Sequence, residues 1–438
     1  MSTLKTHNLQ SPDASNVNIA LAPNAGMVVT GIATFNNAVS VGNSVTATAF
    51  YGDGTNLTGV DASTLKFGGA TKAQANAAGV VVTGILTATS FKGDGSGLTG
   101  LITPLSNRNL IINGAMLVDQ RGDYSTNNSN LSRQYGGPDR FHQYYYQSDE
   151  SARYTFKQGG SGVSPVDKGF SNVAHLDVTT AQTSVTAGQA LWTSQRIEAY
   201  SASHLKFGSS DAESVTLSFW IKSSVTGIYT IMLNHTNMDE RYITTYTVNN
   251  ADTWEKKTIT FPGDTRSGKT IAATNGYGLE VKWVWMAGSS RVATPNEWAT
   301  QGNKYGASGV TLANIFSSTS NNLYLTGVQL EVGDTATSFE HRNFGDEFLR
   351  CARYYYKQTN VSIEMLLSRT GGRRVANVYF PVPMRTTPTV TINTAFTDGG
   401  ASISPSSVSI HHYKAIQNSS SANGSAPNFS DWEADAEL

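Results

Sequence analysis

The sequence predicts an all-β protein that assembles as an elongated homotrimer. A near-repeat lies in an N-terminal third that is poor in large apolar side chains, and short alternating segments broken by turn residues follow it. Charged residues make up only 14% of the chain, below the quarter that is typical of globular domains. We therefore expect an N-terminal segment (residues 1–25) followed by a repeat-containing shaft (26–104) and a jelly-roll β-sandwich (105–342). A short linking helix (343–358) and a small C-terminal β domain (359–438) complete the chain.

The repeat occupies residues 45–59 and 86–100. In each copy small polar and apolar residues alternate as in a strand, and a Gly-Asp-Gly turn follows, because glycine tolerates positive φ and aspartate bonds its own backbone. A structural turn is favoured over a phosphate-binding loop, since no βαβ context surrounds the glycines. One carboxylate per copy is few for calcium, so a structural turn is favoured over a calcium site for these residues: Gly52, Asp53, Gly54, Gly93, Asp94 and Gly95.

The shaft has too little apolar material for one chain to fold alone. Residues 1–104 contain no Trp, one Tyr and four Phe. Ordering a residue costs about 1–2 kcal/mol, and burying a Phe or Val returns only about 1.5–3 kcal/mol. The Ala-rich stretch 70–78 is either a short helix or a spacer. Three chains wound around one axis would bury the sparse apolar set several times: Val28, Val29, Ile32, Phe35, Phe50, Leu57, Val80, Val82, Ile85, Phe91 and Leu98.

Composition excludes several classes of partner. The net charge of −1 excludes a strongly basic nucleic-acid groove or a polybasic membrane patch. No apolar run approaches the roughly 20 residues of a membrane helix, and no signal-peptide pattern opens the chain, so we expect neither membrane insertion nor signal-directed secretion. The single Cys351 cannot form an internal disulfide, and we expect it to be a buried small hydrophobe.

A hydrophobic core begins after Pro104, because all seven Trp lie beyond it. Short alternating segments predict a sandwich or jelly roll. Residues Ile259 and Phe261 close one strand before Pro262. Two other strands each present one apolar face: Val215, Leu217, Phe219 and Ile221 on the first, and Tyr277, Leu279, Val281, Trp283 and Trp285 on the second.

A helix is predicted over 344–355. Asn343 is placed to cap it, acidic residues lie in its first turn, and apolar residues recur at helical spacing. We expect this helix to link two β domains and Tyr354–Tyr356 to pack at their joint. Alternation over 375–382, 390–396 and 408–413 then predicts a terminal β domain that ends in a polar, partly disordered tail.

Several motifs together resemble those of bacteriophage tail-fibre proteins. They are NLIINGAMLVDQRG (109–122), DRF (139–141), GVQLEVGDTATSFEHR (327–342) and CARYY (351–355). The block FPVPMRTTPTV (380–390) is similar to their terminal β domain, and the opening residues with the Gly-Asp-Gly repeats resemble fibres of phages that infect marine cyanobacteria. The resemblance implies a carbohydrate-binding-module-like jelly roll, with Asn113-Gly114 and Gln329–Glu331 on the first and last strands of the sandwich.

The resemblance also implies a role on the virion. The N-terminus would attach to tail proteins such as an adaptor or nozzle, and the distal β domains would bind host cell-surface polysaccharide or lipopolysaccharide. Two alternatives are a purely structural tail adaptor or spacer and a polysaccharide depolymerase. Degrading members of the family usually carry a long parallel β-helix, for which this chain lacks the tandem repeats, so we expect no enzyme activity.

Sugar rings stack on aromatic faces while polar side chains hold their hydroxyls. Trp254, Trp298 and Tyr305 lie in or beside turn-rich segments and are candidate platforms, although most Trp residues of a sandwich are core residues. The terminal domain offers a second candidate surface: His411, His412, Tyr413 and Trp432.

The sequence gives weaker support for a catalytic or metal site than for a sugar-binding site. Asp139 and Asp239-Glu240 are candidates for glycoside hydrolysis only because they are acids. The histidines show no metal spacing, and His411 and His412 point to opposite faces of a strand, so we expect no metal or cofactor.

Overall fold

The computed structural model describes the chain in separate stretches. In the first third these are 8–9, 19–22, 26–29, 32, 34, 64–67, 70–76 and 79–86. Beyond them it describes 107–438 except 126–133, 147–151, 161, 236–239, 301, 360–362, 368–372, 397–401 and 419–427. The chain divides into two compact units, residues 1–91 and 92–438. The Gly-Asp-Gly turns at 52–54 and 93–95 lie outside the described residues.

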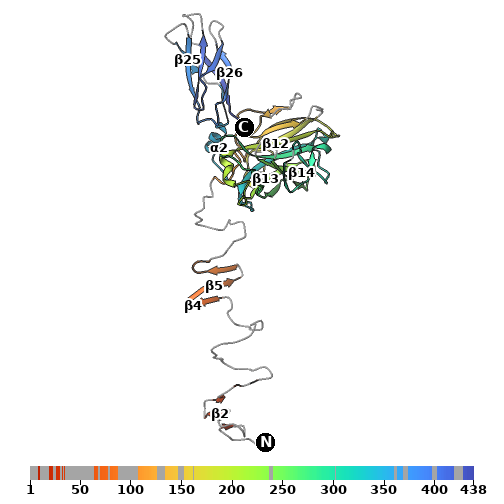
Figure 1. The fold of residues 1–438 in the computed structure, drawn as a ribbon, viewed down its shortest axis with the longest axis vertical. Coiled ribbons are helices and arrows are strands. Elements are labelled where there is room, and N and C mark those ends of the chain that lie inside the picture. The colour runs from red at the N-terminus through yellow and green to blue at the C-terminus, as the bar shows by residue number, and fades with distance from the viewer. Residues whose placement is uncertain are drawn as a thin grey trace. The chain divides into compact units, whose positions relative to one another are not determined.

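The first unit contains two three-stranded antiparallel sheets, whose labelled strands β2, β4 and β5 are seen in Figure 1. Residues 70–76 form a strand, which corrects the expectation of a helix or spacer. They pair with neighbours on both sides, and this pairing outweighs the helix preference of alanine. The strands are β1 (Asn8–Leu9), β2 (Ile19–Ala22), β3 (Gly26–Val29), β4 (Thr64–Phe67), β5 (Ala70–Asn76) and β6 (Gly79–Val82).

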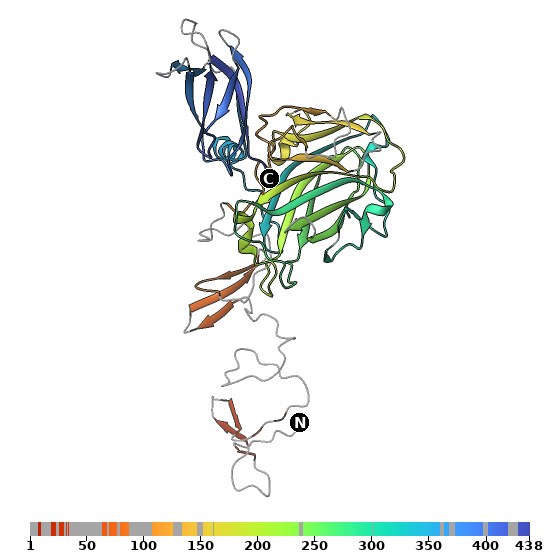
Figure 2. The ribbon, with the colours of Figure 1, turned by 45° about the horizontal axis from the view of Figure 1, so that its top comes forward.

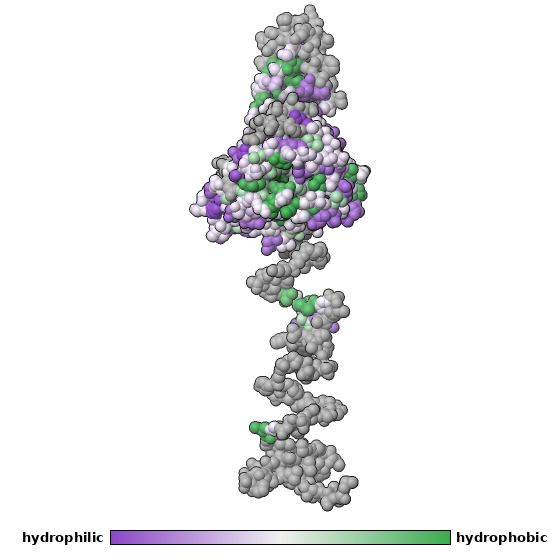
Figure 3. Space-filling model, turned by 90° about the vertical axis from the view of Figure 1, so that its right-hand side faces the viewer, coloured by the Kyte–Doolittle hydropathy of each residue, from purple (hydrophilic) through white to green (hydrophobic). Residues whose placement is uncertain are grey.

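Strand β6 leaves large apolar side chains exposed on both of its faces. Val80 is 68% exposed and Val81 is 55% exposed, and successive residues of a strand point to opposite faces. Ile85 and Leu86 just beyond it are 94% and 58% exposed. Figure 3 shows apolar surface (green) in this unit. One chain therefore leaves the described apolar residues of this strand without cover.

The second unit is built on a β-sandwich of two antiparallel sheets. The six-stranded sheet has the order β16 (Glu255–Phe261), β13 (Val215–Ser223), β21 (Asn322–Val332), β11 (Val173–Thr180), β10 (Arg153–Gly159) and β7 (Tyr124–Ser125). The seven-stranded sheet has the order β19 (Trp298–Thr300), β15 (Glu240–Val248), β14 (Gly227–His235), β17 (Tyr277–Ala287), β12 (Ala190–Glu198), β9 (His142–Tyr146) and β8 (Gln134–Tyr135).

Short elements complete the sandwich. The parallel pair β18 (Val292–Ala293) and β20 (Gly306–Ala307) lies between β17 and β21 in sequence. Helix α1 (Ala199–Ala202) follows β12, and single 3-10 turns occupy Val166–Lys168, Ser203–Leu205, Ser289–Arg291 and Ile315–Ser317. The chain crosses between the sheets at nearly every connection from β11 to β17 (Figures 1 and 2), as in a jelly roll.

The two sheets share the core that the sequence predicts. The predicted faces of β13 and β17 meet across it, where the rings of Phe219 and Trp283 lie 5.7 Å apart, edge to face. Trp285 is 1% exposed and lies in the same core. Strand β16 ends at Phe261, as predicted. Tyr277 alone departs from the expected face, since it is half-buried beside an irregularity between β12 and β17.

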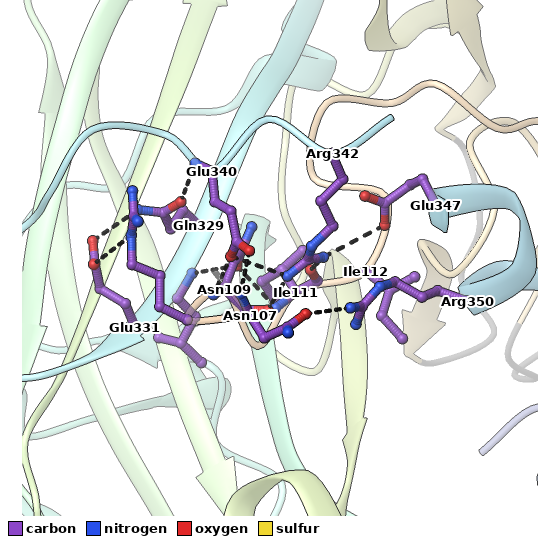
Figure 4. Close-up of polar contacts among 12 residues, drawn as sticks. Asn107, Asn109, Ile111, Ile112, Gln329, Glu331, Glu340, Arg342, Glu347 and Arg350 are labelled. Atoms are coloured by element: carbon purple, nitrogen blue, oxygen red, sulfur yellow. Dashed lines mark hydrogen bonds and ion pairs between the residues drawn. The ribbon is translucent and has the colours of Figure 1, made fainter. Parts of the chain in front are cut away.

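Two of the motifs that carry the resemblance, residues 109–122 and 327–342, lie side by side (Figure 4). Asn109 accepts backbone hydrogen bonds from Ile111 and Leu330, both at 3.0 Å. Arg342 donates to the carbonyl of Asn109 at 2.6 Å and forms an ion pair with Glu347 at 3.6 Å. Residues 109–114 run beside β21 without forming a regular strand, which corrects the expectation that Asn113-Gly114 lies on the first strand.

The C-terminal part forms a second small sandwich. Helix α2 (Phe344–Ala352) starts as predicted, because the Asn343 side chain accepts from the Asp346 backbone at 2.9 Å, but ends before Tyr355. Cys351 is fully buried on this helix, as expected. One sheet contains β22 (Tyr355–Gln358), β29 (Asn428–Asp435), β23 (Ile363–Glu364) and β26 (Thr389–Phe396). The other contains β24 (Leu366–Leu367), β25 (Arg373–Tyr379), β28 (His412–Asn418) and β27 (Ile403–Ser406).

The final residues form a structural strand, Asn428–Asp435, which corrects the expectation that the chain ends in a partly disordered tail. β29 pairs with β22 on one side and with β26 on the other. Its alternate residues Trp432 and Ala434 are fully buried, and Ala436 just beyond it is 4% exposed. The intervening acidic residues occupy the opposite face, which is why the segment reads as polar.

Ion pairs join this domain to the jelly roll. Arg140 pairs with Glu437, and Arg353 pairs with Glu198 at 2.8 Å. Arg121 pairs with Asp435 at 3.0 Å and lies 3.5 Å from the centre of the Tyr355 ring. Tyr354 is 3% exposed and donates to Glu198 at 2.9 Å. The tyrosine run therefore packs at the joint, as the sequence predicts.

Candidate functional site

The three platform candidates of the jelly roll lie in different environments. Trp254 is half-buried and lies on the six-stranded sheet near Tyr324, with 6.4 Å between ring centres. Trp298 packs against the core, and its indole nitrogen donates to the carbonyl of Pro262 at 2.7 Å. Tyr305 is only 4% exposed, on the opposite sheet from Trp254. The structure does not bring the three together.

The aromatic candidates of the C-terminal domain are core residues. Tyr413 and Trp432 are fully buried, and their ring centres lie 5.1 Å apart. This corrects the expectation that they form a surface. His412 is half-buried and lies 5.7 Å from the ring of Tyr379, which is 71% exposed.

Tyr305 instead belongs to a cluster that the sequence did not reveal. Tyr144 and Trp192 pair across β9 and β12, which places both rings on the outer face of the seven-stranded sheet, away from the main core. Tyr146 lies one alternate position along β9 on the same face. Tyr305 reaches this face from the segment before β20. We call these four residues the aromatic cluster.

The four rings form a closed set. Trp192 lies between Tyr144 and Tyr305, at 4.7 and 4.4 Å, and both pairs are stacked. Tyr146 lies 5.5 Å from Tyr305 and 6.4 Å from Tyr144. Trp192 and Tyr305 are each 4% exposed, whereas Tyr144 and Tyr146 are half-buried. The two β9 tyrosines are therefore the part of the cluster that a ligand can reach.

Cationic side chains lie over the rings of the cluster. Arg291 lies 4.4 Å from the centre of Tyr146, and Arg241 lies 5.0 Å from that of Tyr305. The Lys282 ammonium lies 5.0 Å from the Trp192 ring. Such contacts are typical of a cation held against the negative face of a π-system.

Beside the cluster lies a buried polar group centred on Glu280. Its carboxylate accepts from the Ser194 hydroxyl at 2.7 Å and lies 3.4 Å from the Lys282 ammonium and from His142. Burial lowers the pKa of Lys282 to about 8, against the opposing charge of Glu280. Burial alone would raise the pKa of Glu280, but the Lys282 charge and a hydrogen bond from His142 hold it well below its usual range. Glu280 is therefore an ionised carboxylate whose negative charge is already balanced by its neighbours.

One polar atom of the cluster has no partner. The indole nitrogen of Trp192 is buried and makes no hydrogen bond within the described part of the chain. A buried donor normally finds an acceptor. Aromatic faces with polar groups at their edge are the chemistry that holds a sugar ring.

The acidic candidates for hydrolysis are engaged in structural contacts. Asp139 is 2% exposed and accepts from Gln120, and burial raises its pKa. Burial alone would raise the pKa of Glu240, but hydrogen bonds from Lys269 and Thr300 and the charge of Arg266 lower it. Asp239 lies outside the described residues. Within the described residues, no group of three or more His, Cys, Asp or Glu side chains is placed to hold a metal ion, and no helix is long and apolar enough to span a bilayer.

Comparisons with known proteins give weak structural similarities. No protein-family model matches the chain, and no curated protein matches it. Among solved structures, the enzymatically active domain of a tailspike protein from bacteriophage CBA120 is 13% identical, with 51% of this chain and 21% of that chain covered and a TM-score of 0.27. This chain therefore spans about a fifth of the length of that tailspike domain.

Carbohydrate-binding modules are also similar. A family 11 module from Clostridium thermocellum in complex with a mixed-linked tetrasaccharide is 12% identical, with 50% of this chain and 99% of that chain covered and a TM-score of 0.24. The xylan-binding CBM22-2 domain from Paenibacillus barcinonensis is 14% identical, with coverages of 48% and 98% and a TM-score of 0.22. At these TM-scores the site is assigned from the chain's own residues.

Proposed function

We propose that this chain is a phage tail fibre protein that binds a host cell-surface glycan through its distal β domains. The observation that carries the proposal is the aromatic cluster on the outer face of the seven-stranded sheet. Tyr144 and Tyr146 supply reachable ring faces, Arg291 lies over the Tyr146 ring, and Lys282 lies over the Trp192 ring. The fibre motifs of the sequence support the role on the virion.

The fibre is a homotrimer in this proposal. The support is β6, where Val80 and Val81 expose more than half of their surface on opposite faces of a single chain. Each fully buried valine contributes about 1.5–3 kcal/mol, so three chains that cover these side chains gain stability that one chain cannot. The N-terminal residues, about 1–25, attach the fibre to a tail adaptor or nozzle protein.

Assembly multiplies a weak sugar contact. A millimolar contact corresponds to about 4 kcal/mol. Joining several such sites on one body raises the overall affinity by about 10² to 10⁴ without any new contact. The proposal assigns no catalytic step to the chain, because the two described acidic candidates, Asp139 and Glu240, are held in structural contacts.

The experiment compares adsorption to host cells, and binding to extracted host polysaccharide, for the full chain and two variants. Tyr144→Ala removes a reachable ring of the cluster, and Tyr379→Ala removes a more exposed tyrosine on the C-terminal domain as a matched control. Stacking on one ring is worth about 0.5–1.5 kcal/mol, so we expect Tyr144→Ala to bind up to tenfold more weakly and the control to bind normally. Full binding by Tyr144→Ala would refute the site, and no binding by the unmodified chain would favour a structural spacer.

A further inference from the structure

The charge around the aromatic cluster differs from that of the whole chain. The chain has a net charge of −1, so its overall electrostatics select no partner. At the cluster, however, three cationic groups lie within 5.0 Å of a ring centre, on Arg241, Lys282 and Arg291. The local charge can therefore select a ligand where the net charge cannot.

The pairing of the strands brings these cations to one face. Met232 on β14 pairs with Ile243 of β15 on one side and with Lys282 of β17 on the other. Arg241 lies two residues from Ile243 and therefore on the same face as Lys282. Arg291 follows β17 and donates to the carbonyls of Gly188 at 2.7 Å and Asn303 at 3.3 Å. Two sheet positions and one anchored loop thus fix the three cations.

The nearby carboxylate of Glu280 already forms ion pairs within the protein. Glu280 is 1% exposed and is paired with Lys282, Arg196 and His142. A second negative group brought by a ligand would therefore meet the half-buried Arg291 rather than a free acid. Arginine presents a planar fork of donors that matches carboxylate and sulfate oxygens.

We propose that the aromatic cluster binds an anionic polysaccharide, with a sugar ring on Tyr144 and Tyr146 and its carboxylate or sulfate group beside Arg291. This inference rests on the proposed function and names the class of glycan for the same site. A neutral glycan would use the rings alone. An anionic glycan gains a charge-assisted contact at the edge of the ring, where the cations already lie.

The test measures binding of the full chain to pairs of polysaccharides that share a sugar backbone and differ in whether their acidic groups are charged. Polygalacturonate is compared with its methyl-esterified form, and a sulfated galactan with its desulfated form, in 50 mM and 500 mM NaCl. We expect at least tenfold tighter binding to the charged member of one pair at low salt, and a smaller preference at high salt because the Debye length falls to a few ångströms. The polysaccharide pair whose charged member binds more tightly shows whether the site prefers a carboxylate or a sulfate group.

Variants locate the effect. Arg291→Gln should lose about fivefold in affinity for the charged polysaccharide and little for the neutral one, and Arg291→Lys should keep most of the charge preference. Lys256→Gln, an exposed cation on the other sheet, should change neither. Thermal unfolding of each variant confirms that the fold is retained.

The outcomes separate the two proposals. Equal binding to charged and neutral members overturns the anionic class but leaves glycan binding in place. A charge preference that Arg291→Gln does not reduce overturns the placement of the anionic group beside Arg291 and leaves glycan binding in place. Binding to none of the four polysaccharides and to no extracted host polysaccharide overturns both.

Discussion

The ring of Tyr305 stacks on the ring of Trp192, with 4.4 Å between their centres and 23° between their planes. This contact joins the segment before β20 to the middle of the seven-stranded sheet. Tyr305→Ala should therefore cost about 3–5 kcal/mol in the free energy of unfolding, as for other large aromatic truncations. Tyr305→Phe keeps the ring and loses only a 3.3 Å hydrogen bond to Asn303, so it should cost below about 1.5 kcal/mol. Urea denaturation measures both, and equal losses would show that stacking is not what holds the segment.

Glycan binding should weaken as the pH rises past the pKa of Lys282. Burial lowers that pKa to about 8, so the ammonium is charged below pH 8 and neutral above it. Three charged groups face it, namely Glu280 on its own strand, Arg241 on β15 and Arg196 on β12. We expect affinity for a charged polysaccharide to fall about fivefold between pH 7 and pH 9.5, the scale of one ion pair.

The matched control is Lys282→Arg, which stays protonated throughout this range. Its affinity should be flat from pH 7 to pH 9.5. A decline of the same size in this variant would assign the titration to another group.

The joint between the two sandwiches depends on a buried ion pair. Arg140 is 1% exposed and pairs with Glu437, whose side chain is 5% exposed. Glu437→Gln leaves the Arg140 charge buried without its counter-ion, which should cost about 3–5 kcal/mol. Replacing both partners together, as Arg140→Met with Glu437→Leu, should cost less. Chemical denaturation followed at both domains is the measurement, and a loss below 1 kcal/mol for the single change would contradict a structural role.

Asp119 should make stability depend on pH. Burial, aided by the charges of Asp139 and Asp123, raises its pKa to about 6 despite a hydrogen bond from Gly122. A raised carboxyl pKa contributes stability that is complete below about pH 4 and is lost as the pH rises through 6. Because the side chain is only half-buried, the loss by pH 7.5 is about 1 kcal/mol after allowance for solvent screening.

Asp119→Asn should therefore stabilise the protein at pH 7.5 relative to the unmodified chain, and should have no such benefit at pH 4. The amide oxygen can still accept from the Gly122 backbone, as the carboxylate does at 2.8 Å. Unfolding temperatures at the two pH values measure the difference. A gain of equal size at both values would rule out ionisation as the cause.

The sequence predicts local structure well where one strong periodic signal decides it. The faces of β13 and β17 follow from strict alternation, and α2 follows from the cap at Asn343. The sequence does not reveal strand β29, because its outward residues are acidic and only its alternate residues Trp432 and Ala434 are fully buried. The strand at 70–76 was missed because its identity depends on pairing from both sides.

The candidate site was predicted only in part. The sequence indicates Tyr305 as a candidate platform, but its burial against Trp192 follows from tertiary packing. Tyr144 meets Trp192 only through the register of β9 and β12, which no local pattern reveals. The available signal was the Tyr144–Tyr146 run, in which two of three rings share one strand face. Tyr413 and Trp432 lie in polar stretches of sequence, which makes them resemble surface residues. In the structure they instead fill the core of a small domain.

The fibre role depends on several chains sharing the apolar residues of the first unit, so the molar mass of the full chain in solution is the most direct measurement. We predict about 140 kDa by light scattering, three times the 46.8 kDa of one chain. Replacing Val80, Val81 and Ile85 by serine should weaken that assembly. A stable 46.8 kDa monomer at micromolar concentration would contradict the account.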